Sequence, residues 1–188
     1  YTMQTTINGQ LMLCMLAEQL MKIPRLTMVQ INTDGATVRC PRKYLPHLRT
    51  VCKWWEGLTK LQLEEALYSR MMVRDVNSYI GVYENGKVKR KGAYEYETQW
   101  HQDPSMKVVA KAAEAALVHG KCMATFIVEH TNPFDFMIRG KVPRSARLVS
   151  RENGVETEWQ KTTRFFISTI GGSLVKVMPP TQPEGSWK

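Results

Sequence analysis

The chain opens with a segment that is nearly all apolar. Residues 9–22 read GQLMLCMLAEQLMK, in which Leu and Met dominate and the strongly polar residues gather near the end. Good helix formers in such a run predict a mostly buried helix. Pro24 prevents that helix from continuing, because proline lacks the N–H group that a helix interior needs.

Two short β-prone segments follow and flank a tight turn. Residues 27–31 and 36–39 are rich in Val, Ile and Thr, and Asn32-Thr33-Asp34-Gly35 separates them. This pattern predicts strand, turn and strand. Beyond a break at residues 41–46, apolar residues recur at the three-and-four spacing of an amphipathic helix over residues 47–56: Leu48, Val51, Cys52 and Trp55. Gly57 is expected to end this helix.

A second hairpin is predicted further along the chain. Residues 79–83 and 87–91 flank Glu84-Asn85-Gly86, and Asn-Gly is a strong hairpin signal. The returning strand contains the basic residues Lys87, Lys89, Arg90 and Lys91. The preceding residues 63–76 fit a helix and a strand equally well.

The pattern changes near residue 104. Asp103-Pro104-Ser105 is typical of a helix start, residues 106–119 are rich in Ala, and Gly120 is placed to end the helix. Later segments are β-prone and rich in turns, notably residues 122–128, 163–168 and 174–177. We therefore expect an α+β fold with two regions, residues 1–104 and 105–188.

Composition narrows the class of partner. The chain has 26 Lys and Arg residues and 17 Asp and Glu residues, which gives a formal charge of +9. This charge favours a polyanionic partner such as nucleic acid over a neutral ligand. A generally basic surface without such a partner would explain the charge equally well. The four cysteines form no CxxC pair, which indicates a reducing compartment and gives no support for zinc. No apolar run approaches the roughly 20 residues of a membrane-spanning helix, so no membrane partner is expected.

The turn at residues 32–35 contains the strongest candidate for chemistry. A carboxylate at the tip of a rigid hairpin is exposed and held in place, as a site for a hard cation requires. Asp34 is that carboxylate. The alternative is an ordinary hairpin turn, because Asp-Gly is a common turn dipeptide.

The neighbourhood of this turn resembles family B DNA polymerases of the phage type, in the C-terminal palm and thumb portion. Asn32-Thr33-Asp34-Gly35 lies where that family has its third palm motif, of the form DTDS. In the family a glycine-containing segment precedes this hairpin, and TTINGQ at residues 5–10 is similar to that segment. VNSYIGVYENGKVKRKGAY at residues 76–94 resembles the strand pair that ends in a basic KKxY-like element. The resemblance covers roughly the first 120 residues well and the remainder weakly.

The resemblance implies a partial palm at residues 1–104 and a thumb-like region at residues 105–188. It implies that Asp34 is a catalytic ligand of Mg²⁺ or Mn²⁺, one of two ions in the complete enzyme, with Asn32, Thr33 and Gly35 as its motif neighbours. The substrates would be primer-template DNA and deoxynucleoside triphosphates, in the cytoplasm of a phage-infected bacterial host. DNA contacts would come from five residues: Lys87, Lys89, Arg90, Lys91 and Tyr94.

The sequence also departs from the family. Asn32 replaces the first aspartate of the motif, the first and second palm motifs are not found, and neither is the Asp-x-Glu pair of a proofreading exonuclease. Two-metal phosphoryl transfer requires carboxylates that bridge both ions, so Asp34 alone is insufficient. Asp75, Asp103 and Asp135 are further aspartates, but their spacing does not favour that role. The isolated chain is expected to be inactive, with the other motifs supplied upstream in the same gene or by a separate subunit.

Other interpretations remain open. Strand alternation places Lys87, Lys89 and Lys91 on one face and Arg90 on the other. Such a row of lysines could bind DNA phosphates. Alternatively, it is the solvated face of an edge strand, where lysines prevent aggregation. A thumb surface and scattered surface charge are equally compatible with four later basic residues: Arg139, Lys141, Arg144 and Arg147. The alternatives for the whole chain are a non-catalytic nucleic-acid-binding module and another palm enzyme such as a nucleotide cyclase.

Overall fold

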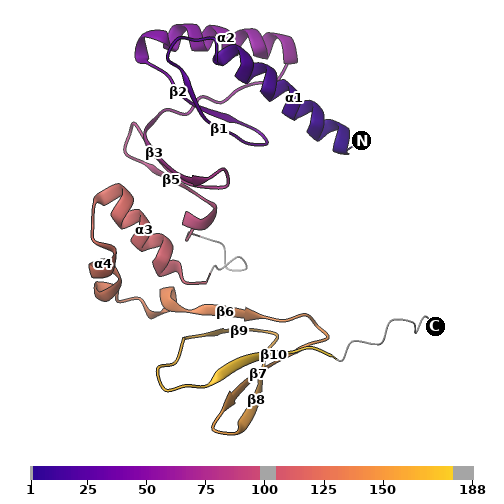
Figure 1. The fold of residues 1–188 in the computed structure, drawn as a ribbon, viewed down its shortest axis with the longest axis vertical. Coiled ribbons are helices and arrows are strands. Elements are labelled where there is room, and N and C mark those ends of the chain that lie inside the picture. The colour runs from indigo at the N-terminus through magenta and orange to yellow at the C-terminus, as the bar shows by residue number, and fades with distance from the viewer. Residues whose placement is uncertain (1, 98–104, 180–188) are drawn as a thin grey trace, which may run out of the picture. The chain divides into compact units, whose positions relative to one another are not determined.

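The chain forms two compact α+β units that meet between Ala93 and Tyr94 (Figure 1). A computed structural model describes residues 2–97 and 105–179. The boundary expected near residue 104, and the helix start expected at Asp103-Pro104, lie outside the described residues. All the strand pairs within the described residues are antiparallel, as the expected α+β class allows.

The first unit contains two α-helices, two short 3-10 helices and two sheets. The helical elements are α1 (Thr2–Leu20), η1 (Arg42–Tyr44), α2 (Leu45–Thr59) and η2 (Gly92–Tyr94), the last of which runs into the second unit. The strands are β1 (Thr27–Ile31), β2 (Ala36–Arg39), β3 (Tyr68–Asp75), β4 (Ser78–Tyr83) and β5 (Val88–Lys91). β1 pairs with β2, and the second sheet has the order β3-β4-β5.

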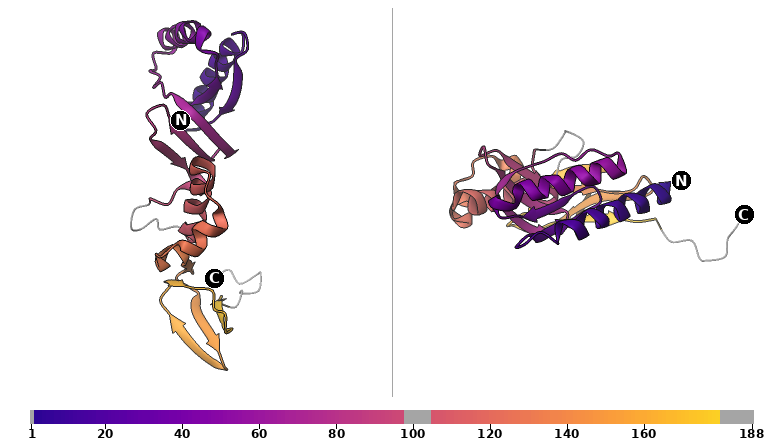
Figure 2. Two further views of the ribbon diagram at one scale, coloured as in Figure 1. Left: turned by 90° about the vertical axis from the view of Figure 1, so that its left-hand side faces the viewer. Right: turned by 90° about the horizontal axis from the view of Figure 1, so that it is seen from above.

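The core of the first unit joins the two helices to the first hairpin. Leu16, Leu20, Ile23 and Trp55 are buried together, and partly buried side chains of β1 and β2, including Met28 and Val38, pack against them. Figures 1 and 2 show α1 and α2 lying side by side next to this hairpin. The predicted helix is therefore present, and it packs against the hairpin that contains Asp34.

Both predicted helix bounds need correction. α1 begins at Thr2 and not near residue 9, although residues 3–8 are exposed. Extending an existing helix costs little free energy, and Gly9 lowers helix stability by only about 1 kcal/mol relative to Ala. Gly57 lies inside α2. That helix ends at Thr59 and is capped by Lys60, which takes a left-handed conformation and donates its N–H to the Glu56 carbonyl at 2.9 Å.

Trp55 fixes the contact between the two helices. Its side chain is 2% exposed, and its Nε1–H donates to the Met12 carbonyl of α1 at 2.7 Å. Trp55→Phe keeps most of the apolar area but leaves that carbonyl without this donor, so we expect a loss of about 1 kcal/mol in the free energy of unfolding. Urea unfolding measures it. Trp54→Phe, at a side chain that is 46% exposed, is the matched control and should be nearly neutral.

The strand predictions for the first unit are confirmed. β1 and β2 have the predicted bounds, and residues 63–76, which were ambiguous, contain strand β3. The turn at Asn85-Gly86 joins β4 to β5: Gly86 has a φ of 83°, and the Lys87 N–H donates to Asn85 Oδ1 at 3.0 Å. The sequence signal and the turn geometry therefore agree.

The second unit places two helices before two small sheets. Its elements are α3 (Lys107–His119), α4 (Met123–Glu129), η4 (Pro133–Phe136), β6 (Ile138–Lys141), β7 (Arg147–Glu152), β8 (Val155–Trp159), β9 (Thr162–Phe165) and β10 (Ser173–Val177). β6 pairs with β9, and the other sheet has the order β10-β7-β8. Val142, Ala146 and Leu148 form a buried cluster against which Leu174 packs.

The helix and two strands predicted for the second unit are confirmed, whereas the prediction at α4 is wrong. Helix α3 begins at Lys107, one residue after the predicted start, since Met106 has a left-handed conformation with a φ of 54°, and it ends at Gly120 with a φ of 68°. The strands near residues 163 and 174 are present. Residues 122–128, predicted as β-prone, form a helix instead. Packing against α3 and stacking of the Phe126 ring on His130 at 5.3 Å favour the helix over the local preference of Thr, Ile and Val for strands.

Within residues 2–97 and 105–179, no helix combines the length and the apolar character that crossing a bilayer demands.

Candidate metal site and nucleic-acid interface

Asp34 lies at the tip of the β1–β2 hairpin and is exposed, as predicted. The Asn32 N–H donates to the Gly35 carbonyl at 3.0 Å, so Thr33 and Asp34 form the centre of the turn. None of the four turn residues has a positive φ. Gly35 therefore does not supply the left-handed conformation for which Asp-Gly turns are selected, and the turn geometry does not by itself explain the dipeptide.

Two buried side-chain oxygens, one on β1 and one in the turn that follows it, lack hydrogen-bond donors. Gln30 Oε1 and Asn32 Oδ1 are the buried side-chain polar atoms without a partner among the residues that the structure describes. Gln30 belongs to β1, whereas the Asn32 side chain lies over the turn, with its Oδ1 3.4 Å from where a Cβ on Gly35 would be. A buried carbonyl oxygen without a donor is costly, so each of these oxygens suits a cation, a water molecule or a donor from another segment.

The described residues form no metal-binding cluster around Asp34. No group of three or more His, Cys, Asp or Glu residues suited to a metal ion occurs in the described ranges. Asp75 is engaged elsewhere: it accepts from Arg74 Nε at 2.8 Å and from the Asn77 N–H at 2.9 Å, and the hydrogen bond from Arg74 lowers its pKa. Asp135 belongs to the second unit, and Asp103 lies outside the described residues.

The basic strand β5 is an edge strand, and its lysines point outward. Lys89 and Lys91 are exposed, whereas Val88 and Arg90 are half-buried, so the strand alternates as predicted. Lys87 precedes the strand, and its carbonyl accepts from the Tyr83 N–H at 2.8 Å to close the turn. The outward cationic face of β5 therefore consists of Lys89 and Lys91.

Tyrosine side chains of β3 and β4 lie on the same face of the sheet as Lys89 and Lys91. Gly81 pairs with Lys89, and Tyr79 pairs with Lys91. The ring of Tyr68 lies over Gly81, because a Cβ on that glycine would fall 2.6 Å from Tyr68 Cε1, and the ring stacks on Tyr83 with centroids 4.7 Å apart. Burial and the hydrogen bond to Tyr83 raise the pKa of Tyr68. Sequence reasoning missed this pair, although a glycine inside an apolar strand was a signal for a ring placed above it.

Gly92 ends β5 at a position that only glycine fits. Its φ is 61°, and a Cβ there would collide with the Asn77 carbonyl oxygen. Tyr94, the fifth predicted DNA contact, is half-buried in η2 and is assigned to the second unit. It is thus near the basic strand in sequence, but the structure does not group it with Lys89 and Lys91.

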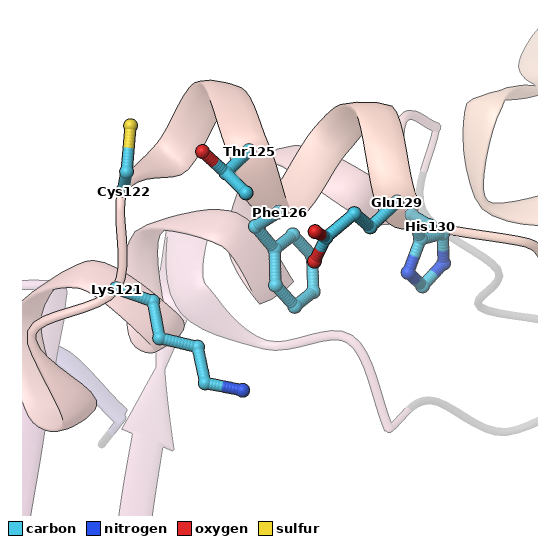
Figure 3. A pocket seen from close by; sticks show the side chains of 6 residues that line it. All are labelled: Lys121, Cys122, Thr125, Phe126, Glu129 and His130. Carbon is cyan, nitrogen blue, oxygen red and sulfur yellow. The ribbon is translucent and has the colours of Figure 1, made fainter.

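An open hollow of about 390 Å³ lies along α4 in the second unit. Figure 3 shows Cys122 at one end of the helix and His130 at the other, with the Cys122 sulfur directed away from the imidazole. Hydrogen bonds from the N–H and hydroxyl of Thr125 lower the pKa of the Cys122 thiol. A nucleophile and a base that do not face each other form no catalytic pair, so Cys122 and His130 are not arranged as one in this structure.

No model of a known protein family matches the chain, and no curated protein matches it. The functional argument therefore depends on the residues themselves.

Proposed function

We propose that the chain is the palm and thumb part of a DNA-templated DNA polymerase, in which Asp34 binds one of two catalytic Mg²⁺ or Mn²⁺ ions. The observation that supports this best is the Asp34 hairpin, which combines an exposed carboxylate at its tip with two unpartnered buried oxygens, those of Gln30 and Asn32. Asn32 Oδ1 is one of those oxygens and occupies the place of the motif's first aspartate. An amide oxygen can be a neutral ligand of a hard cation.

The chemistry assigned to Asp34 is electrostatic. In two-metal nucleotidyl transfer the ions stabilise the attacking primer 3′-hydroxyl and the leaving pyrophosphate, and carboxylates hold the ions at the required separation. Asp34 supplies one carboxylate. The second, and the lysine that grips the nucleotide, belong to other segments of the polymerase, either of the same gene or of a separate subunit. Primer extension by the complete enzyme, with and without Mg²⁺, tests the proposal.

A second candidate function is a non-catalytic nucleic-acid-binding module. It is favoured by the finding that residues 2–97 and 105–179 contain no group of three or more His, Cys, Asp or Glu side chains suited to a metal ion. The two functions differ in their dependence on metal: a binding module should hold DNA equally well with Mg²⁺ and with EDTA, and it should add no nucleotide when the other palm motifs are supplied.

Both functions predict that the face of β5 contacts DNA phosphates. Each phosphate contact that is lost reduces the slope of log affinity against log salt by about 0.9. Lys89→Ala with Lys91→Ala should therefore reduce that slope by about 1.8 and weaken every DNA sequence alike, because phosphate contacts do not read bases. Fluorescence anisotropy with a labelled primer-template duplex, repeated over a range of salt concentrations, measures the slope.

The matched control removes two lysines from elsewhere in the same unit. Lys22 and Lys53 are exposed and lie outside the β3-β4-β5 sheet. Their replacement by Ala changes the net charge equally and should leave the slope within about 0.5 of the parent. Equal slopes for the two double variants would remove β5 from the DNA surface.

A further inference from the structure

The two sheets of the second unit differ in how their cations are balanced. In the β10-β7-β8 sheet, Arg147 forms ion pairs with Glu156 at 2.9 Å and Glu158 at 3.6 Å, and Arg151 pairs with Glu156 at 2.9 Å. Strand β8 thus supplies carboxylates to the arginines of β7. This sheet is internally neutralised, and Arg147 is a weaker candidate for a phosphate contact than its sequence position suggested.

The β6–β9 pair contains cations and no acidic residue. Its sequences are IRGK and TTRF, and its register places Arg139 opposite Arg164 and Lys141 opposite Thr162. Two like charges directly opposite each other in an antiparallel pair oppose folding. We call this two-stranded element the β6–β9 ribbon.

The inner face of the β6–β9 ribbon is fixed by packing. A Cβ on Gly140 would lie 3.2 Å from Leu174 Cδ2 and 3.4 Å from Leu148 Cδ2, so the ribbon lies close against strands β10 and β7 (Figure 1). Side chains alternate between the two faces of a strand. Arg139 and Lys141, the neighbours of Gly140, therefore point away from that core, on the same side as Arg164.

Arg139 and Lys141 have no protein partner for their charged groups. Within the part of the chain that the structure describes, neither the Arg139 guanidinium nor the Lys141 ammonium forms an ion pair or a hydrogen bond. The backbone beneath them is held, because the Arg139 N–H donates to Ser105 Oγ at 2.8 Å. The ribbon thus presents two unneutralised cations on an ordered strand.

We propose that the outer face of the β6–β9 ribbon binds the phosphate backbone of duplex DNA. Residues two apart on a strand are separated by about 6.6 Å, which lets Arg139 and Lys141 contact neighbouring phosphates of one DNA strand. The guanidinium of Arg139 can hold a phosphate through two parallel hydrogen bonds, and Lys141 adds a point charge. The inference is independent of Asp34 and of β5, since it uses residues of the second unit alone.

The test compares two double variants of the whole chain that remove equal charge. Arg139→Ala with Lys141→Ala removes the free cations, and Arg147→Ala with Arg151→Ala removes two neutralised ones. Binding of a labelled duplex of mixed sequence is measured by anisotropy at several salt concentrations. We expect the first variant to reduce the slope of log affinity against log salt by about 1.8, and the second to reduce it by less than half as much.

Two further measurements separate local contact from general effects. Arg139→Lys with Lys141→Arg keeps both charges and should restore most of the slope, which a misfolded ribbon would not allow. The proposal would be overturned if both alanine variants reduced the slope equally, or if the Arg139→Ala, Lys141→Ala variant left the slope unchanged. It would also be overturned if that variant lost binding to phosphatidylserine vesicles to the same extent as binding to DNA. The Lys89→Ala, Lys91→Ala variant in the same assay distinguishes the two surfaces. If the slope of log affinity against log salt decreases in that variant alone, DNA contacts β5 and not the ribbon.

Discussion

The proposed polymerase function predicts that Asp34→Asn in the complete enzyme abolishes metal-dependent nucleotide incorporation while leaving DNA binding nearly intact. The substitution keeps the size and the hairpin but removes the charge that holds a divalent ion, so the loss falls on the chemical step. We expect a decrease of at least about a thousandfold in the rate of single-nucleotide addition, equivalent to about 4 kcal/mol in the activation free energy. Rapid-quench primer extension under single-turnover conditions measures it.

Asn32 provides the internal control for this experiment. Asn32→Ala removes a neutral oxygen from the same hairpin, and its effect on incorporation should be smaller by at least about tenfold, because no charge is lost. Both variants should bind primer-template DNA as the parent does. If the Asp34→Asn enzyme adds nucleotides at a rate within a few-fold of the parent rate, Asp34 is not a catalytic residue. If Asp34→Asn and Asn32→Ala reduce that rate equally, the cause is a damaged turn instead.

The local features of the hairpins were predictable because the chain specifies them over short distances. Strand bounds at residues 27–31 and 36–39 follow from β-prone residues flanking a turn, and Asn85-Gly86 specifies a turn that needs a positive φ. The exposure of Asp34 follows from its place at the tip. In each case the deciding interaction lies within a few residues of the signal.

Features decided by tertiary packing were not predictable. The α4 helix has the β-branched residues of a strand, and its conformation depends on its contacts with α3 and on the ring of His130. Likewise, the pairing of Arg147 with Glu156 requires the register of β7 and β8, and the sequence alone left Arg147 and Arg139 equivalent. The burial of the unpartnered oxygens of Gln30 and Asn32 is a property of the folded hairpin that the residue pattern does not report.

The sequence also gave no signal for a buried charge network in the second unit. Asp135 is 3% exposed, and its Oδ2 meets Lys111 Nζ at 2.7 Å and His130 Nε2 at 2.5 Å. These contacts connect η4 to α3 and to the end of α4. Burial alone would raise the pKa of Asp135, but the hydrogen bonds and charges of Lys111 and His130 outweigh it and lower that pKa. The ionised carboxylate therefore stabilises the folded unit.

Asp135→Asn should lower the free energy of unfolding by about 3 kcal/mol at pH 7, because it leaves Lys111 without its buried counter-charge. The sign of the pH dependence follows from the lowered pKa: the stabilisation is complete above the unfolded-state value of about 3.9 and is lost as the pH falls through the folded-state value. The difference between parent and variant should thus shrink below about pH 4. Urea unfolding at several pH values measures it, and Glu156→Gln, at an exposed ion pair, should cost less than about 1 kcal/mol. A pH-independent difference would mean that Asp135 stabilises the unit through packing and hydrogen bonds and not through its charge.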